Sequence, residues 1–264
     1  MNNVFNLRRF GWLFRKTIME RPVQLLGLML LVIALDIMIY AFCKAVSGFD
    51  LAQSCSFVIG ITGGGCFLAS FVYSHFASNA SGSSFLTLPA STFEKWLCGV
   101  LISGVLYTAI FLLFYKLMDT TFISFYHKGL DAKGPFYKEL YDRVQPFQLM
   151  GFVANKTYIM FFNFAGCMLI GTLYFNKAPF IKVALVVCAI CFGAFLLNLL
   201  MANMFFKDVN SAFPYFFVYV TEGSQTGRLE LPTGTLKNLN TVFEYILPSI
   251  LWLLALLRLK EKEF

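Results

Sequence analysis

The stretch Ser78–Glu94, SNASGSSFLTLPASTFE, is a polar segment rich in small residues that separates two long apolar runs. The chain is 58% hydrophobic and only 13% charged, whereas soluble domains carry about 25% charged residues. Because the flanking runs are apolar enough to lie in lipid, this stretch is expected in water or at a headgroup surface. It therefore determines how the chain turns at the edge of a bilayer.

Six apolar runs have about the length of roughly 20 residues that a helix needs to cross the hydrocarbon core. They cover residues 22–42, 55–76, 96–118, 157–175, 180–206 and 242–259. Each run is continuous, which favours helices over the alternating strands of a closed barrel. We therefore predict an all-α polytopic membrane protein, with a single transmembrane domain over residues 1–264.

Basic residues beside the predicted spans indicate the orientation. Eleven of the 21 Lys and Arg residues lie in segments that would be on the inner side if the amino terminus were cytoplasmic. The positive-inside rule then predicts that both termini are cytoplasmic, in a bacterial inner or plasma membrane. Anionic lipid at that surface accounts for the net charge of +7, so no nucleic-acid partner is expected.

Residues 3–20 form a predicted amphipathic helix before the first span. Leu7, Phe10, Phe14 and Ile18 step by three, four and four residues, which places them on one apolar stripe. The opposite side carries Arg8, Arg9, Arg15 and Lys16. Two interpretations stay open: a helix lying in the inner headgroup plane, or a positively charged flank with helical character.

Asp36 is a carboxylate deep within the first predicted span. Ionisable groups at membrane depth face a bundle interior or water. Asp36 therefore either lines a substrate path or pairs with a polar group on another helix. In the second span, Gly63–Gly65 predicts close contact between helix backbones.

The motifs of several enzyme classes are missing. The sequence contains no GxxxxGK[ST] phosphate loop, no GxSxG elbow and no HExxH pair. The two histidines, His75 and His127, are expected on opposite sides of the membrane, so no metal site is predicted. We expect no catalytic residue and no cofactor in this chain. Cys43 and Cys55 flank the first outer turn, and whether they pair stays open.

The end of the polar stretch contains a helix start signal. Ser91-Thr92-Phe93-Glu94 fits the capping box, and Pro89 restricts Leu88 to an extended conformation. The chain is therefore predicted to cross a flexible Ser/Gly/Asn segment, turn at Leu88–Pro89 and begin a capped helix. This pattern is typical either of a well-capped loop or of a short docking element.

Leu88-Pro89-Ala90-Ser91, followed by Glu94-Lys95 and placed between the second and third of six spans, resembles the corresponding loop of ABC-2 type transporter permeases. The basic helix before the first span also resembles that family. So does Ser211–Val220, a short apolar segment that is expected to be re-entrant before the sixth span. As sequence, the likeness is specific only over Phe85–Trp96.

The resemblance implies a transmembrane permease subunit that couples through residues 78–95 to a separate cytoplasmic ATPase, which would hold the ATP and Mg²⁺. It further implies a dimer with itself or a similar subunit, and export as the direction of transport. The residues expected to dock the ATPase are Leu86, Leu88, Pro89, Ser91 and Glu94.

Two other functions stay open on the sequence. The chain is alternatively a non-transporting accessory, immunity or scaffold subunit that binds a partner. It is alternatively a secondary transporter driven by an ion gradient, with Asp36 as the proton or cation site. The long outer segment over residues 119–155 is expected to contain one or two short interfacial helices, and no substrate is indicated.

Overall fold

The computed structural model describes residues 5–20, 22–77, 79–131, 133–134, 136–175, 178–205, 209–213, 217–222, 225–230 and 232–262. These residues are nearly all helical. Six helical stretches are long and apolar enough to cross a bilayer. The chain is therefore an integral membrane protein, as its composition predicts.

The six spans follow a separate first helix, α1 (Leu7–Glu20). They cover Pro22–Ser47, Phe49–Val72, Thr92–Lys128, Phe152–Tyr174, Pro179–Phe205 and Lys237–Glu261. Each predicted apolar run falls on one of them, so the number and order of the spans are confirmed. The boundaries differ most in the third span, which continues past Met118 to Lys128 because amphipathic residues extend the helix beyond the apolar run.

Three spans are single α-helices, and each of the other three contains a π-helical segment. The uninterrupted helices are α2 (Pro22–Ser47), α9 (Phe152–Tyr174) and α10 (Pro179–Phe205). The interrupted spans are α3 (Phe49–Ile59), η1 (Gly60–Gly64) and α4 (Gly65–Val72); α6 (Thr92–Val100), η3 (Leu101–Leu106) and α7 (Tyr107–Lys128); and α11 (Thr233–Thr241), η4 (Val242–Ile246) and α12 (Leu247–Glu261). Such π-helical turns are rare in proteins, and those that occur are often found at functional sites.

A small antiparallel sheet lies between the fifth and sixth spans, so the all-α prediction is wrong there. Its strands are β1 (Val209–Phe213), β2 (Phe217–Glu222) and β3 (Gln225–Glu230), in the order β1-β2-β3. Residues 211–213 of the segment predicted to be re-entrant therefore lie in β1 and residues 217–220 lie in β2, while residues 214–216 fall outside the described part of the chain. The run Phe217-Val-Tyr-Val-Thr is β-branched or aromatic throughout, which favours a strand when the segment is too short to cross a bilayer.

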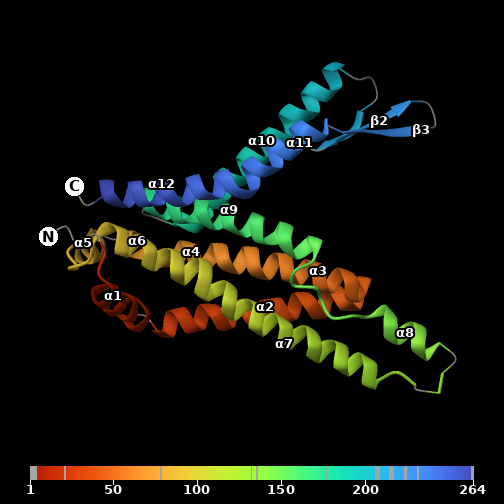
Figure 1. The fold of residues 1–264 in the computed structure, drawn as a ribbon, viewed down its shortest axis with the longest axis horizontal. Helices are drawn as coiled ribbons and strands as arrows, with labels where there is room; N and C mark the ends of the chain where they lie inside the picture. Colours follow the sequence, from red (N-terminus) through yellow and green to blue (C-terminus); the bar gives the residue numbers. More distant parts are fainter. Residues whose placement is uncertain are drawn as a thin grey trace.

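The two termini lie at the same end of the molecule, together with η2 (Ser74–Ala77), α5 (Asn79–Leu86) and the start of α6 (Figure 1). The opposite end carries α8 (Tyr137–Arg143), a short helix in the loop where one or two were expected. At that end α10 and α11 diverge from the other spans and carry the sheet (Figure 1). An even number of crossings explains why the termini share one side.

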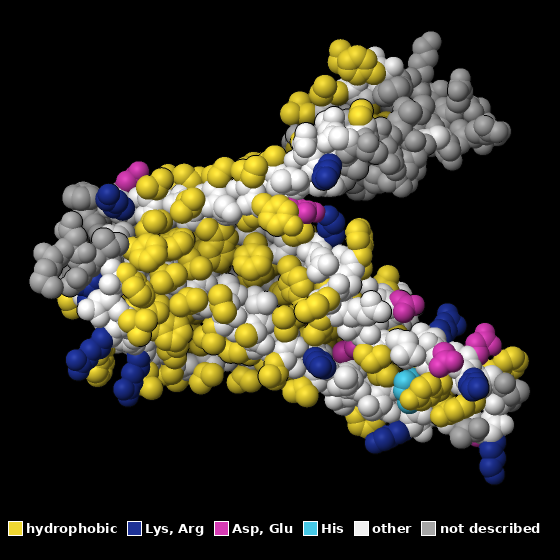
Figure 2. All heavy atoms as spheres, in the orientation of Figure 1, with side chains coloured by type: hydrophobic (Ala, Val, Ile, Leu, Met, Phe, Trp, Pro, Cys, Tyr) yellow, Lys and Arg dark blue, Asp and Glu magenta, His cyan; other side chains and the backbone are white. Residues whose placement is uncertain are grey.

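Hydrophobic side chains cover the middle of the face that Figure 2 shows. Lys and Arg side chains gather toward the two ends of the face shown. The exposed apolar residues include many on α2 and α10, such as Leu30, Met38, Ile190 and Leu197. This distribution matches a surface that is covered by lipid tails.

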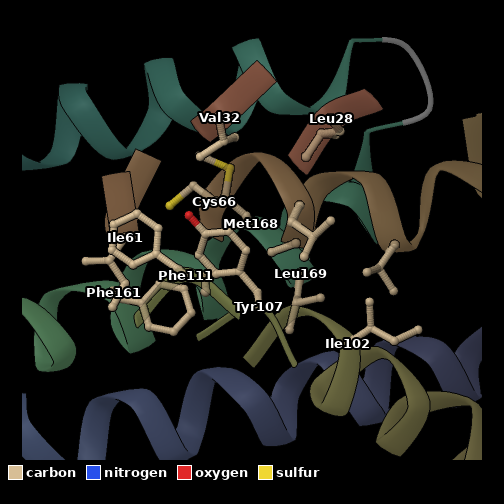
Figure 3. Close-up of a cluster of buried hydrophobic side chains, with 14 of the residues drawn as sticks. Leu28, Val32, Ile61, Cys66, Ile102, Tyr107, Phe111, Phe161, Met168 and Leu169 are labelled. Atoms are coloured by element: carbon tan, nitrogen blue, oxygen red, sulfur yellow. The ribbon is translucent and has the colours of Figure 1, made fainter. Parts of the chain in front are cut away.

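The buried core between α2, the second and third spans and α9 centres on Tyr107 (Figure 3). Its hydroxyl donates to the Gly60 carbonyl at 2.6 Å. A Cβ on Gly64 would collide with this hydroxyl and stand 2.6 Å from Val32 Cγ1, and one on Gly65 would collide with the Phe161 ring. The predicted close helix contact is therefore confirmed at Gly64 and Gly65. A Cβ on Gly63 would meet only Ile59 Cγ2, at 4.0 Å.

Asp119 organises the end of the bundle opposite the termini. Its buried carboxylate accepts hydrogen bonds from the Tyr40 hydroxyl at 2.8 Å, from Gln53 Nε2 at 3.0 Å and from the Phe147 backbone N–H at 2.8 Å. These bonds join α2, α3 and α7 to the segment before α9. The sequence interpretation had assigned Asp119 to the outer loop, whereas it lies within α7.

Cys43 on α2 and Cys55 on α3 lie near each other. Both are free. The two cysteines whose pairing the sequence leaves open are therefore neighbours, but they form no disulfide.

The neighbouring glycines of η1 provide a matched test of the packing. Gly64→Ala is expected to lower the stability of the protein by about 1–3 kcal/mol, because the added methyl overpacks the Tyr107 contact. Gly63→Ala adds the same methyl where space is open. Thermal unfolding of the two purified variants in one detergent measures the difference. Equal melting temperatures would contradict the packing described around Tyr107.

Candidate functional site

The predicted capping box at the start of α6 is present. Ser91 Oγ accepts from the backbone N–H of Glu94 at 3.2 Å, and Glu94 Oε2 accepts from the backbone N–H of Ser91 at 3.0 Å. The two residues thus satisfy amides that a helix start leaves without partners.

The same carboxylate also holds the start of α1. Glu94 Oε1 accepts from the Asn6 backbone N–H at 2.7 Å and from Arg9 Nη2 at 2.8 Å. Glu94 Oε2 accepts from Arg9 Nε at 2.7 Å. The Asn6 side chain in turn accepts from the backbone N–H of Arg8 at 3.0 Å and so caps α1. One carboxylate therefore stands at the amino-terminal ends of two helices, where the helix dipoles favour a negative charge.

The electrostatics of this pair follow from its geometry. Glu94 is fully buried, and it receives two donors from the Arg9 guanidinium in the bidentate arrangement that makes such bonds strong. Hydrogen bonding to Glu94 raises the pKa of Arg9 above its already high value. The ion pair therefore links α1 to α6.

Residues 79–86 form helix α5, so the prediction of a flexible Ser/Gly/Asn segment is wrong. Lys95 explains the difference in part: its Nζ, which is buried, donates to the carbonyl of Leu86 at 2.8 Å and so satisfies the end of α5. Phe85 anchors the same helix, since its ring is buried, stacks on His75 and contacts Phe76 edge-on. None of these long-range partners follows from local propensity.

The five predicted docking residues fall into three groups. Leu86 and Leu88 are half-buried against the core, and Ser91 and Glu94 hold the chain itself together. Pro89 is exposed. Thr87, Ser83 and Ser84, which the prediction did not include, are exposed around it.

The apolar stripe predicted on α1 is mostly directed at the protein. Phe10, Phe14 and Ile18 pack partly buried against the core, together with Leu13, which is buried and was not predicted. Leu7 lies outside this face, with 78% of its surface exposed. Arg8, Arg15 and Lys16 are exposed, as the amphipathic pattern predicts.

Two indoles connect α6 to the last span and to α9. Trp96 Nε1 donates to the Trp252 carbonyl at 2.9 Å, and Trp252 Nε1 donates to the Phe162 carbonyl at 2.9 Å. Gly166 of α9 lets the Trp252 ring approach, because a Cβ there would stand 3.1 Å from it. No local sequence pattern predicts this connection, since tryptophan in an apolar run is equally typical of lipid contact.

Asp36 occupies a different part of the molecule, facing η1. Only 1% of its surface is exposed, and within the described part of the chain no donor reaches either carboxyl oxygen. It lines a cavity of about 270 Å³ between α2 and the second span. The structure thus shows no polar partner for Asp36 on another described helix.

Comparison with protein-family models, with curated proteins and with solved structures gives no match to this chain. The resemblance to ABC-2 permeases therefore rests on residues 85–96 and on the order of the helices.

The role of Glu94 is testable with a shape-conserving change. Glu94→Gln is expected to release α1 from α6, because an amide nitrogen cannot accept from the donors that the carboxylate satisfies. The expected result is a lower melting temperature and faster proteolysis between α1 and α2. Glu139→Gln, at an exposed glutamate of α8, is the matched control and should leave both unchanged. Proteolysis of Glu94→Gln at the wild-type rate would show that α1 is held by its apolar face alone.

Proposed function

We propose that the chain is the transmembrane permease subunit of an ATP-driven exporter of the ABC-2 class. It couples through residues 78–95 to a separate cytoplasmic ATPase that holds ATP and Mg²⁺. The observation that carries the proposal is the Glu94 carboxylate, which joins α1 and α6 beside α5 at the end where both termini lie. The loop that bears the sequence resemblance is thereby a fixed surface.

A fixed surface is what coupling to a separate motor requires. If the ATPase moved a flexible loop, the spans would not follow. If it moves an element that is packed against the spans, those spans are displaced with it. Lys95 fixes α5 through the Leu86 carbonyl, and Glu94 fixes α1. The docking segment and the amphipathic helix therefore respond as one unit.

The unit is connected to the spans by the two indoles. Trp96 follows Glu94 by two positions and bonds to the carbonyl of Trp252, whose own indole bonds to that of Phe162. A displacement of the start of α6 is thus passed to α12 and α9 through direct contacts. Such contiguous contacts are the physical means by which a remote site is coupled to a pathway.

The exposed part of the segment supplies the contact surface for the ATPase. Thr87 and Pro89 lie between two helices that are held in place, and the basic residues of α1 lie at the same end. On this proposal that end is cytoplasmic, in agreement with the positive-inside rule. The second permease subunit, identical or similar, and the outward direction come from the resemblance to the family.

Affinity purification of the tagged protein in mild detergent is expected to recover a P-loop ATPase in about equal amount. Thr87→Arg is expected to weaken that association about tenfold or more, because an uncompensated charge at an interface costs upward of about 1.4 kcal/mol. The measurement is the ratio of ATPase to permease by quantitative mass spectrometry.

Thr121→Arg is the matched control, since both threonines are exposed and the hydroxyl of each donates to a backbone carbonyl three or four residues earlier in the chain. Thr121 belongs to α7, away from the docking segment. No ATPase with the wild-type protein would refute the proposal. Transport that persists without any ATPase and is lost in Asp36→Asn would instead favour the ion-coupled transporter.

The orientation has its own test. In a cysteine-free background, Ser83→Cys is expected to react with a membrane-impermeant maleimide only from the cytoplasm, because Ser83 is exposed within the docking segment. Lys133→Cys, between α7 and α8, should react only from outside. The reverse pattern would place the docking segment on the side without ATP and would exclude the coupling role.

A further inference from the structure

The groove between α2 and the second span has apolar walls and one carboxyl group. Leu31 and Leu35 line it from α2, and Ile59 and Phe67 line it from the other side. All four are between 42% and 54% exposed. Because both helices cross the membrane, a groove open at these residues is open to the hydrocarbon of the bilayer.

Asp36 lies at the base of this groove with both oxygens buried and, among the described residues, without a donor. Gly60 makes room for it, since a Cβ at that position would stand 2.8 Å from Asp36 Oδ1. The Tyr107 hydroxyl in the same cluster donates to the Gly60 carbonyl instead. The protein therefore presents an acceptor that its own side chains leave unused.

We propose that this groove binds a lipophilic amine, with the ammonium group at Asp36 and the hydrocarbon chain along Leu31, Leu35 and Phe67. A buried carboxylate is stabilised by a donor that also carries positive charge, and such charge-assisted bonds are the strongest available to it. An anionic group would be repelled, and an alkane would leave the carboxylate unsatisfied. The apolar walls of the groove favour a hydrocarbon chain for the part of the ligand beyond the ammonium group.

The depth of Asp36 decides between a free amine and a phospholipid headgroup. With a rise of 1.5 Å per residue, Asp36 lies about 21 Å along α2 from Pro22 and about 17 Å from Ser47. It is therefore near the middle of the bilayer, whereas a phospholipid headgroup remains at the interface. The cavity of about 270 Å³ also suits a single-chain molecule, since it is smaller than most sites for drug-sized ligands.

The chain offers two changes that separate charge from shape. Asp36→Asn keeps the shape of the side chain and removes the charge. Gly63→Leu fills the groove, because Gly63 lines it and meets only Ile59 Cγ2 at 4.0 Å. Gly27→Leu is the matched control: Gly27 lies on α2, outside the groove lining, with nothing within 4 Å of its Cβ position.

The experiment is photolabelling of the purified protein in lipid nanodiscs with a diazirine-bearing dodecylamine. The uncharged probe is the corresponding dodecanol. Peptide mass spectrometry is expected to find the amine on residues 31–35 and 59–67, about tenfold or more above the alcohol, as a charge-assisted bond implies. Unlabelled dodecylamine should compete, and dodecanol should not.

In Asp36→Asn, labelling by the amine probe should fall to the level of the alcohol probe. In Gly63→Leu, labelling by both probes should fall. Gly27→Leu should be labelled to the same extent as the wild type. Equal labelling of the wild type by amine and alcohol would overturn the proposal without recourse to any variant. Undiminished amine labelling in Asp36→Asn would overturn it as well. The measurement needs no ATPase, so its outcome is independent of the proposed coupling role.

Discussion

The end of the molecule that carries both termini depends on one buried carboxylate. Removing a carboxylate from water costs several kcal/mol unless donors replace the solvent, and Glu94 obtains them from Asn6, Ser91 and Arg9. The next two residues extend the same arrangement. Successive helix positions point about 100° apart, so Glu94, Lys95 and Trp96 face α1, α5 and α12 in turn. Three consecutive side chains thus position three separate elements around one helical turn.

The buried acids of the described chain divide by how well they are satisfied. Glu94 and Asp119 each receive at least three hydrogen bonds, and they join elements at opposite ends of the bundle. Asp36 receives none from the described residues, although a charge at the bilayer centre costs about 3 kcal/mol. A buried acid that destabilises the protein and forms no internal hydrogen bond is typical of a functional position. The contrast separates carboxylates that build the fold from the one that remains available to a ligand.

Hydrophobic length alone was sufficient to predict the six spans, because lipid leaves a chain few alternatives to the helix. The capping box was equally predictable, since all its atoms lie within four residues. The contacts of Glu94 with Arg9, and of Trp96 with Trp252, join residues 85 and 156 positions apart, and no local pattern encodes them. The sheet was not predicted because the residues of a short apolar segment form strands when their β propensity is high. Helix α5 was not predicted because it is stabilised by the contacts of Phe85 with His75 and of Lys95 with the Leu86 carbonyl.

The Glu94 unit and the Asp36 groove belong to one packed structure. Helix α6, which carries Glu94 in its first turn, continues through η3 to Tyr107, whose hydroxyl donates to the carbonyl of Gly60 in η1. Gly64 leaves the space that the Tyr107 hydroxyl fills, and Gly60 makes room for the Phe111 ring and for Asp36. Because such an interior is close-packed and transmits strain, α6–α7 cannot move relative to the second span without changing the floor of the groove. Tyr107, the first residue after η3, therefore bonds to η1 at the place where a movement that begins at the membrane surface would reach the Asp36 carboxyl group.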